Sequence, residues 1–388
     1  MRIAFYAPMK APTHPTPSGD RRMAQLIMAA LEVAGHDVQL ASTFRSYDGK
    51  GVAARQAELE TAGHAETEQL IEAWQNLPAD KRPDLWVTYH LYHKAPDWLG
   101  PAVSAALNIP YVVAEASYAR KQARGPYARN LAVTAQAIAR AQVVLSITPE
   151  DEDALRPLVA GPDSLMRLPP FVDTAPYDAA HGARTEHRSE LAAQYGLDPD
   201  KTWLITVGMM RPGDKLASYR LLGRALWLIA DPEFHLLVIG DGDARSLVHD
   251  ALDPLGENVA VFLGAQDAAD LPGLYAAADL FVWPAYNEAY GMALLEAQAT
   301  GLPVVAGGFR GVPEVVADSE TGTLIAPWSD IAFAEAVVQL TRDSELRDTF
   351  SQNARTKVAN QHSLTAASSA LEAALERAVM LHQRQHNK

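Results

Sequence analysis

Two glutamates, Glu288 and Glu296, lie on either side of Gly291 in the stretch "NEAYGMALLEAQATGLPVVA". A helix is expected to begin near Gly291 and to end before the Gly-x-Pro that follows, so Glu288 precedes the helix and Glu296 lies more than one turn inside it. The first-turn N–H groups of a helix bind anions, and a carboxylate accepts hydrogen bonds from hydroxyl groups. The pattern is therefore typical of a site for a sugar nucleotide. In the alternative interpretation, Glu296 pairs with a cation and Glu288 is simply solvated.

Two cations, Arg211 and Lys215, flank a Pro-Gly turn in "VGMMRPGDK", after an expected strand and before an expected helix. Positive charges beside a helix N-terminus interact unfavourably with the helix dipole, so these two cations would not stabilise the helix. A bound anion would explain both, since arginine can bind two oxygens and lysine supplies a point charge. The alternative is a pair of solvated surface cations.

The strand expected at "HLLVIG" is followed by Asp241, Gly242 and Asp243. The Gly240-x-Gly242 pair is an incomplete dinucleotide fingerprint, because its third glycine position holds Arg245. Paired aspartates could hold a magnesium or manganese nucleotide complex. We favour a third interpretation, in which the loop lets the backbone approach a ligand and Asp243 lies near a helix N-terminus. That interpretation requires no metal.

The first half of the chain has a comparable loop in "PSGDRRMAQLIMAALEVAGHDV", where Gly19 lies at the expected start of a helix. A glycine there lets backbone N–H groups approach a phosphate or a reacting oxygen. A simple tight turn explains the same residues equally well.

A basic run without any acidic residue lies between Tyr118 and Arg140. Its members are Arg120, Lys121, Arg124, Arg129 and Arg140. The run is either a solvated helix surface or a surface for an anionic partner, such as a phosphorylated acceptor or a membrane leaflet.

Short apolar runs alternate with helical patterns along most of the chain. Strands are expected in the first half at "RIAFYAP", "DVQLAS", "DLWVTY", "PYVVA" and "QVVLSI", and in the second half at "WLITVG", "HLLVIG", "VAVFLG", "DLFVWP", "PVVAG" and "GTLIA". The proline-rich stretch "RLPPFVDTAPYDAA" between them is interpreted as a linker. The alternation predicts two doubly wound α/β domains, over residues 1–170 and 171–369, with ligands in the cleft between them.

The composition narrows the class of protein. The chain has 388 residues, almost half of them apolar, which is enough for two domains with cores of their own. A net charge of −14 disfavours a nucleic-acid-binding surface, and the absence of cysteine excludes disulfides and thiolate metal sites. No apolar run is long enough to span a bilayer, and the start lacks a signal-peptide pattern. We expect a cytoplasmic protein, with peripheral association at the inner face of an anionic membrane as an open alternative.

At this point the motifs resemble a known family, the retaining glycosyltransferases of family 4 (glycosyl transferases group 1), which have the GT-B fold. The resemblance rests on "VGMMRPGDK", "LLVIGDGDA", "VAVFLGA", "LYAAADLFVWPAYNEAYGMALLEAQATGLPVVAGGFRGVPEVV" and "TGTLIAP", in the family's order and spacing. It is most specific over about residues 200–330 and extends more loosely to Gly19, which matches the second glycine of the family's Gly-Gly loop. It implies two Rossmann-like domains facing across a cleft, with a C-terminal helix, about residues 370–388, crossing back to the first domain.

The resemblance also implies an activity, the metal-independent transfer of a sugar from a UDP- or GDP-sugar with retention of the anomeric configuration and without a cofactor. Arg211 and Lys215 would hold the diphosphate and stabilise the leaving group. Glu288 would contact the donor sugar and would not act as a covalent nucleophile. The other implied donor contacts are Gly19, Gly240, Gly242, Leu263, Tyr290, Gly291, Met292 and Glu296, the last of these with the ribose diol.

Two departures from the family pattern concern the first domain. Ser18 replaces the first glycine of the Gly-Gly loop. The histidine that the family often carries after the strand "PYVVA" is absent, and Glu115 stands near that place. Either Glu115 substitutes for it, or His90 or His93 from the preceding strand contacts the sugar or the acceptor. Ordinary loop roles for these histidines are the alternative.

Other functions are alternatives to the transferase, and two of them, an epimerase and a phosphorylase, occur on the same fold. A nucleotide-sugar epimerase would need acid/base groups around the sugar, and a classical phosphorylase a pyridoxal-phosphate lysine. A non-catalytic nucleotide-sugar-binding protein is expected to have lost Arg211, Lys215 or Glu288. A dehydrogenase is disfavoured by the incomplete glycine fingerprint. The acceptor is left open between a carbohydrate, a glycolipid and a small molecule, for example in cell-envelope polysaccharide or glycolipid synthesis.

Overall fold

A computed structural model of the chain describes residues 1–16, 18–230 and 232–386. Pro17 of the glycine loop and residues 387–388 of the expected C-terminal helix therefore lie outside the described residues. The chain divides into two compact units: unit 1 is Met1–Pro169 with Leu364–Lys388, and unit 2 is Pro170–Ser363. The first junction lies beside the expected boundary at residue 170, and the chain returns to unit 1 at Leu364 rather than at residue 370.

Unit 1 is built on a six-stranded sheet in the order β2-β1-β3-β4-β5-β6, in which every neighbouring pair is parallel. A parallel sheet covered on both faces needs apolar residues at nearly every strand position, which the runs "RIAFY" and "YVVA" supply. The strands are β1 Arg2–Tyr6, β2 Asp37–Ser42, β3 Leu85–Leu91, β4 Tyr111–Ala116, β5 Val143–Ser146 and β6 Leu165–Arg167.

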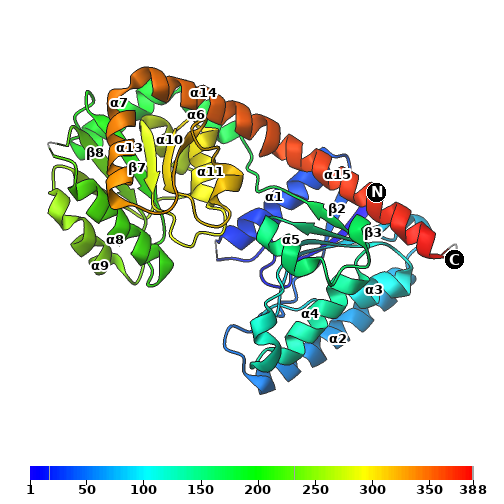
Figure 1. Cartoon of the computed structure of the whole chain (residues 1–388). Coiled ribbons are helices and arrows are strands. Elements are labelled where there is room, and N and C mark those ends of the chain that lie inside the picture. The colour runs from blue at the N-terminus through cyan, green and yellow to red at the C-terminus, as the bar shows by residue number, and fades with distance from the viewer. Residues whose placement is uncertain (17, 231, 387–388) are drawn as a thin grey trace. The chain divides into compact units, whose positions relative to one another are not determined.

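The helices of unit 1 connect these strands and cover the sheet (Figure 1). They are α1 Gly19–Val33, α2 Ala53–Gln75, α3 Gly100–Leu107, α4 Ala128–Arg140, α5 Pro149–Leu155 and α15 Leu364–His386, with short 3-10 segments η1 Ala79–Lys81, η2 Arg120–Arg124 and η3 Pro162–Ser164. Helix α15 packs on α1, β4 and β5 and buries Leu371 and Leu375. The predicted return of the C-terminal helix to the first domain is confirmed.

Unit 2 repeats the architecture, with a six-stranded parallel sheet in the order β12-β11-β10-β7-β8-β9. Its strands are β7 Thr202–Val207, β8 Phe234–Ile239, β9 Ala260–Gly264, β10 Leu280–Trp283, β11 Val304–Gly307 and β12 Gly322–Ile325. The predicted α/β fold with two parallel doubly wound sheets is thus confirmed.

The helices of unit 2 lie on both faces of its sheet (Figure 1). They are α6 Ala175–Gly182, α7 Arg184–Tyr195, α8 Asp214–Trp227, α9 Arg245–Leu252, α10 Leu271–Ala277, α11 Met292–Ala299, α12 Val312–Val315, α13 Asp330–Arg342 and α14 Ser344–Gln361, with the 3-10 segment η4 Asp253–Leu255. The stretch interpreted as a linker is only partly one: it begins at the end of β6 and ends inside α6. Pro176 lies at the first turn of α6, where a proline starts a helix rather than breaking it.

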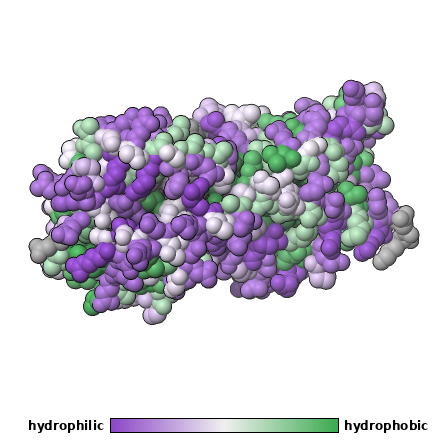
Figure 2. Space-filling view, turned by 90° about the horizontal axis from the view of Figure 1, so that it is seen from above, coloured by the Kyte–Doolittle hydropathy of each residue, from purple (hydrophilic) through white to green (hydrophobic). Residues whose placement is uncertain are grey.

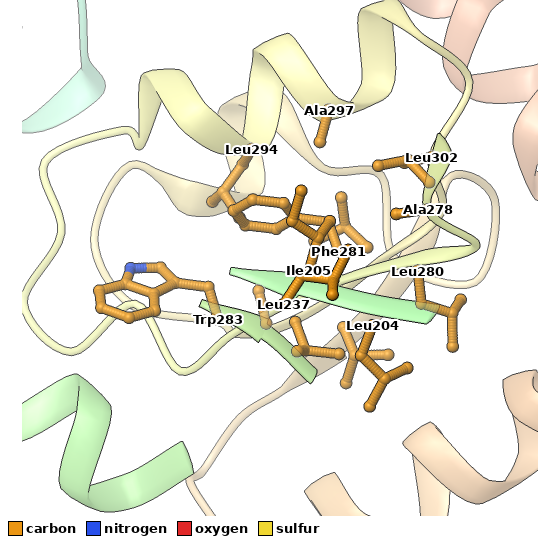
Figure 3. Close-up of a cluster of buried hydrophobic side chains, with 14 of the residues drawn as sticks. Leu204, Ile205, Leu237, Ala278, Leu280, Phe281, Trp283, Leu294, Ala297 and Leu302 are labelled. Carbon is orange, nitrogen blue, oxygen red and sulfur yellow. The ribbon is translucent and has the colours of Figure 1, made fainter. Parts of the chain in front are cut away.

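The core of unit 2 surrounds the central strands β7 and β10 (Figure 3). Ile205, Phe281 and Leu294 are completely buried between the sheet and α11. Trp283 is the last residue of β10 and is 2 % exposed. Its ring therefore joins this apolar cluster to the loop that follows the strand.

None of the helices in the described part of the chain is both long enough and apolar enough to cross a membrane. The face shown in Figure 2 is largely hydrophilic, with hydrophobic residues scattered over it.

Candidate functional site

The topology of unit 2 singles out one place on its sheet. Strands β7, β8 and β9 follow one another in one direction, whereas β10, β11 and β12 follow in the other, so the order reverses between β7 and β10. Ligands of open parallel sheets bind beyond the carboxyl ends of the strands at such a reversal, because the loops there diverge. The loop after β7 carries Arg211 and leads to Lys215, and the loop after β10 carries Glu288. The three residues predicted to be catalytic thus follow the two strands at this point.

Lys215 and Glu288 form an ion pair in which Nζ lies 2.6 Å from Oε2. Both side chains are about four-fifths buried, with exposed fractions of 22 % and 18 %. The indole N–H of Trp283 donates to the same Oε2 at 3.3 Å, and Nζ lies 5.4 Å from the centroid of the Trp283 ring. The buried indole therefore fixes the Glu288 carboxylate and the Lys215 cation in one arrangement, with both charges at the edge of the site.

Arg211 is exposed on the loop between β7 and α8, and the structure does not bring it into the Lys215–Glu288 pair. The next helix begins at Asp214, and no side chain of the described residues caps it. Arg211 therefore lies on an exposed loop three residues before the start of α8. This arrangement leaves the guanidinium available to a ligand rather than committed to a structural ion pair.

The backbone conformation at positions 240 and 242 requires glycine. Gly240 and Gly242 have φ of +145° and +147°, which side-chain-bearing residues rarely adopt. A Cβ on Gly240 would lie 1.9 Å from the carbonyl oxygen of Gly208, and one on Gly242 would lie 2.4 Å from that of Met210. The loop after β8 thus packs backbone to backbone against the loop after β7, which fixes the segment that carries Arg211.

Glu296 lies five residues into α11, as predicted, and is half-buried. The hydroxyl of Tyr275 donates to Oε2 of Glu296 at 3.0 Å. Burial and the nearby Glu296 carboxylate raise the pKa of Tyr275 well above its ordinary value, so this hydroxyl stays protonated and remains a donor. A fully buried phenol from α10 therefore orients the carboxylate.

Gly291 is the N-cap of α11 and has φ +74°, in the left-handed region. No side chain of the described residues caps this helix, so the first-turn N–H groups beginning at Met292 are available to an anion. Tyr290 and Met292 are both half-buried beside it. Ala285 and Asn287 also have positive φ, of +53° and +54°, so two side-chain-bearing residues of the loop from β10 to α11 adopt the left-handed region.

Leu263 is buried near the end of β9, and its carbonyl accepts from the side chain of Gln266 at 2.6 Å. Asp241 and Asp243 are exposed. The Asp241 carboxylate accepts from the backbone N–H of Gly242 and lies 3.7 Å from Arg245. Asp243 precedes α9 without capping it. Among the residues that the structure describes, no group of three or more histidine, aspartate or glutamate side chains is arranged to hold a metal ion.

The sheet of unit 1 reverses its strand order between β1 and β3. The loop after β1 leads to Gly19 and Asp20 at the start of α1, and His90 is the penultimate residue of β3. Nδ1 of His90 is 3.0 Å from Oδ1 of Asp20. Ser18 caps α1 by accepting from the N–H of Arg21, and the space beside Gly19 is open.

Glu115 and His90 share an unusual backbone: both have φ +60° near the ends of adjacent strands. Strain of this kind at side-chain-bearing residues is common at binding sites. Burial raises the pKa of Glu115, and Oε2 has no hydrogen-bond partner among the described residues. For His90, burial lowers the pKa, but Glu115 and Asp20 raise it, and the net direction is upward. His93, in contrast, is buried with its ring edge-on to Tyr92, and no hydrogen bond among the described residues joins it to this cluster.

Three residues that position the site were not assigned from the sequence: Trp283, Tyr275 and Asp20. Trp283 and Tyr275 are aromatic residues within apolar runs, which the sequence cannot distinguish from ordinary core residues. Asp20 had a usable signal, because an acidic residue in the first turn after a glycine loop lies at the carboxyl end of a strand. Its histidine partner, however, is 70 residues away in the chain.

The second half of the chain is similar to a known family of proteins. Residues 188–357 match the model for the glycosyl transferases group 1, which confirms the resemblance in the second half of the chain. A D-inositol 3-phosphate glycosyltransferase of Corynebacterium aurimucosum is 31 % identical over 239 residues, which is 59 % of this chain and 55 % of that protein. The chain thus spans about half the length of the curated relatives it matches.

Solved structures share the fold of nearly the whole chain. The structure of Anabaena Alr3699/HepE in complex with UDP superimposes with a TM-score of 0.73 at 20 % identity, covering 97 % of this chain and 100 % of that one. A glycosyltransferase from Rickettsia africae superimposes with a TM-score of 0.74 at 15 % identity, covering 97 % and 98 %. The chain therefore has the fold of the GT-B glycosyltransferases.

Proposed function

We propose that this chain transfers a sugar from a nucleotide-diphosphate donor to an acceptor, because residues 188–357 match the model for the glycosyl transferases group 1. The observation that carries the proposal is the Lys215–Glu288 pair, at 2.6 Å, after the two strands where the sheet order of unit 2 reverses. A lone surface ion pair would not need a buried indole to orient it. Here Trp283 does so, and the uncapped start of α11 follows three residues after Glu288.

In this proposal unit 2 holds the donor. Lys215 and Arg211 bind the diphosphate, assisted by the N–H groups at the start of α11. Glu288 accepts hydrogen bonds from the donor sugar, and Glu296, oriented by Tyr275, accepts them from the ribose diol. The loop near Leu263 lies by the base. Gly240 and Gly242 let the loops that carry these groups pack closely.

The chemical step breaks the bond between the anomeric carbon and the diphosphate oxygen. A new bond forms from the same carbon to the acceptor hydroxyl oxygen, and the hydroxyl proton passes to the departing diphosphate. If departure and attack occur on one face of the ring, the configuration is retained. Negative charge builds on the diphosphate as the bond breaks, so fixed cations and N–H donors stabilise the transition state without reorganising, by about 3 kcal/mol for a single donor.

The identity of the substrates is a narrower proposal. Alr3699/HepE was also solved with UDP-glucose, which supports a UDP-sugar as the first donor to try. The name of the corynebacterial relative includes D-inositol 3-phosphate, so phosphorylated small molecules belong among the acceptors to try. On the side of unit 1, we propose that His90 and Glu115 contact the acceptor or the donor sugar, since both are strained and belong to one polar cluster.

The test is a donor-hydrolysis screen with UDP-, GDP- and ADP-sugars. One donor should be hydrolysed slowly without acceptor, and Lys215→Ala should lower that rate about a hundredfold. Arg220→Ala is the matched control, because it removes an exposed cation from the same helix. Binding of a donor without hydrolysis or transfer would point to a non-catalytic binding protein instead. If no donor binds and Lys215→Ala behaves like Arg220→Ala, the proposal fails.

Metal independence is tested by the same assay in EDTA. The rate should not change, because lysine, arginine and backbone N–H groups neutralise the diphosphate in this proposal. A rate that falls to the background and is restored by Mg²⁺ or Mn²⁺ would instead favour a metal complex at Asp241 and Asp243.

A further inference from the structure

Two polar side chains in the interior of unit 1 are buried without the partners that buried polar groups normally have. His93 is 9 % exposed and Tyr127 is 6 % exposed. Within the part of the chain that the structure describes, neither ring nitrogen of His93 nor the hydroxyl of Tyr127 has a hydrogen-bond partner. The two rings pack edge to face, with centroids 5.0 Å apart. The two contacting side chains therefore both carry polar atoms with unused hydrogen-bonding capacity.

Two lysines lie beside this pair. Nζ of Lys94 is 5.9 Å from the centroid of the Tyr127 ring. Lys94 follows His93 in the chain, and Lys121 lies in η2, which packs on the helix that Tyr127 precedes. Burial lowers the pKa of His93, and the charges of Lys94 and Lys121 lower it further, so the imidazole is neutral at pH 7. Neither lysine is paired with a carboxylate in residues 1–16, 18–230 and 232–386. Two cations without counter-ions beside two unused polar groups favour an anion.

The carboxylate of Asp48 is already engaged by other groups. Asp48 accepts from the backbone N–H groups of Lys50 and Val52 and from Nε2 of Gln56. These bonds turn its oxygens toward its own loop. Its proximity is nevertheless one of the causes, after burial, that raise the pKa of Tyr127, so the phenol stays protonated and can donate.

We propose that His93, Tyr127, Lys94 and Lys121 form a binding site for a phosphate monoester, carried by the acceptor. That the phosphate belongs to an acceptor rests on the proposed function, whereas the phosphate site itself is argued from residues of unit 1 alone. The imidazole N–H and the phenol O–H donate to phosphate oxygens, and the two lysines supply compact charges to a dianion. Lys121 is exposed and Lys94 is half-buried, whereas both rings are buried, so the lysines are closer to solvent than the rings.

The proposal selects one member of the basic run. Arg129 already pairs with Glu60, with atoms 2.5 Å apart, and Arg140 is exposed at the far end of α4. Lys121 is the member of the run whose charge is among the causes that lower the pKa of His93, and it lies in η2, six residues before Tyr127. A diffuse basic surface would treat Lys121 and Arg140 alike, because both are exposed single charges.

In the test, inorganic phosphate is added to the full chain at low ionic strength, and proton NMR records the signal of the His93 imidazole. The His93 signal is assigned by its loss in His93→Gln. Phosphate should shift this signal and raise the pKa of His93, because a dianion favours the imidazolium. Tyr127→Phe should weaken phosphate binding about fivefold and Lys121→Ala about tenfold, whereas Arg140→Ala should stay within about twofold. Tyr127→Phe keeps the packed ring, so its fold should survive.

Each remaining outcome has a definite meaning. No shift at His93 with up to tens of millimolar phosphate, or equal effects of Lys121→Ala and Arg140→Ala, overturns the site. Glucose 6-phosphate should bind where glucose does not. A different result is that the chain sediments with vesicles of phosphatidic acid in phosphatidylcholine and shows no response to glucose 6-phosphate. That result would overturn the proposed site and indicate a lipid-binding surface. Donor hydrolysis is measured on the same variants. A result that overturns the phosphate site can therefore be distinguished from one that overturns the proposed sugar transfer.

Discussion

At the scale of single residues, the hydroxyl of Tyr275 is the smallest group on which the proposed donor site depends. It donates to Glu296 from a position that is 0 % exposed. Tyr275→Phe leaves the ring in the core but removes the hydrogen bond that orients the carboxylate. We expect the KM for the donor to rise about fivefold to tenfold with kcat nearly unchanged, because the ribose contact is the same in the ground and transition states. Steady-state kinetics check this, and a loss confined to kcat would contradict it.

The His90–Asp20 pair makes a pH-dependent contribution to stability. Charged groups facing His90 are Asp20, Glu115 and Asp151, and their net effect raises its pKa. A histidine whose folded pKa is raised stabilises the fold below its unfolded pKa and loses that contribution as the pH rises through the folded pKa. The pKa of Asp20 is lowered, by the His90 hydrogen bond first, so its contribution is lost only in acid.

The consequence is a prediction about His90→Gln. The drop in melting temperature relative to the unsubstituted protein should be larger at pH 6 than at pH 9. Any cost of changing the side chain at φ +60° is the same at both pH values and cancels in the comparison. Thermal unfolding monitored by circular dichroism measures both drops. Equal drops would show that His90 carries no proton in the pair, and Asp20→Asn should reproduce the same trend.

At the scale of elements, the packing of the loops after β7 and β8 depends on Gly240. In Gly240→Ala the new methyl would lie 1.9 Å from the Gly208 carbonyl oxygen, which is backbone and cannot rotate away. We expect unit 2 to lose more than about 2 kcal/mol of stability, from strain and from displacement of the loop. The control is Gly196→Ala, since Gly196 also has positive φ, of +65°, but open space around it. Urea unfolding should rank Gly240→Ala well below Gly196→Ala.

The elements were largely predictable, because apolar runs of strand length alternate with helical patterns and parallel sheets require such runs. The strand β3 illustrates the limit: it was predicted to end at Tyr89 but extends to Leu91. His90 therefore belongs to the strand and not to a loop. The motifs also located Glu288, Lys215 and Glu296. The pairing of Lys215 with Glu288, the indole that holds them and the Glu115 cluster depend on contacts across the sheet, which local patterns do not encode.

At the scale of the whole molecule, α15 is the element that completes unit 1. It buries two leucines and several smaller residues against α1 and the sheet. A chain truncated after Ser363 loses these contacts, and a single buried leucine is already worth about 2–5 kcal/mol. We expect truncation to cost more than the roughly 5 kcal/mol that marginal domains possess, so unit 1 unfolds while unit 2 remains folded.

Hydrogen exchange resolved by peptide checks this prediction. Peptides from unit 1 should exchange within seconds in the truncated chain, and peptides from β7, β8 and β10 should remain protected. The isolated segment Pro170–Ser363 should show the same protection as in the full chain. Protection lost equally from both units would mean that they fold as one cooperative body.

The two junctions near residues 169 and 364 also set an order of events on the ribosome. Unit 2 is synthesised entirely between the two parts of unit 1. At about 5–20 residues per second, the 194 residues of unit 2, Pro170–Ser363, take roughly 10–40 s to translate. During that time the apolar surfaces of α1 and the sheet that α15 covers remain open, although everything else in unit 1 has emerged. The nascent chain therefore presents a defined binding surface for chaperones until its last long helix arrives.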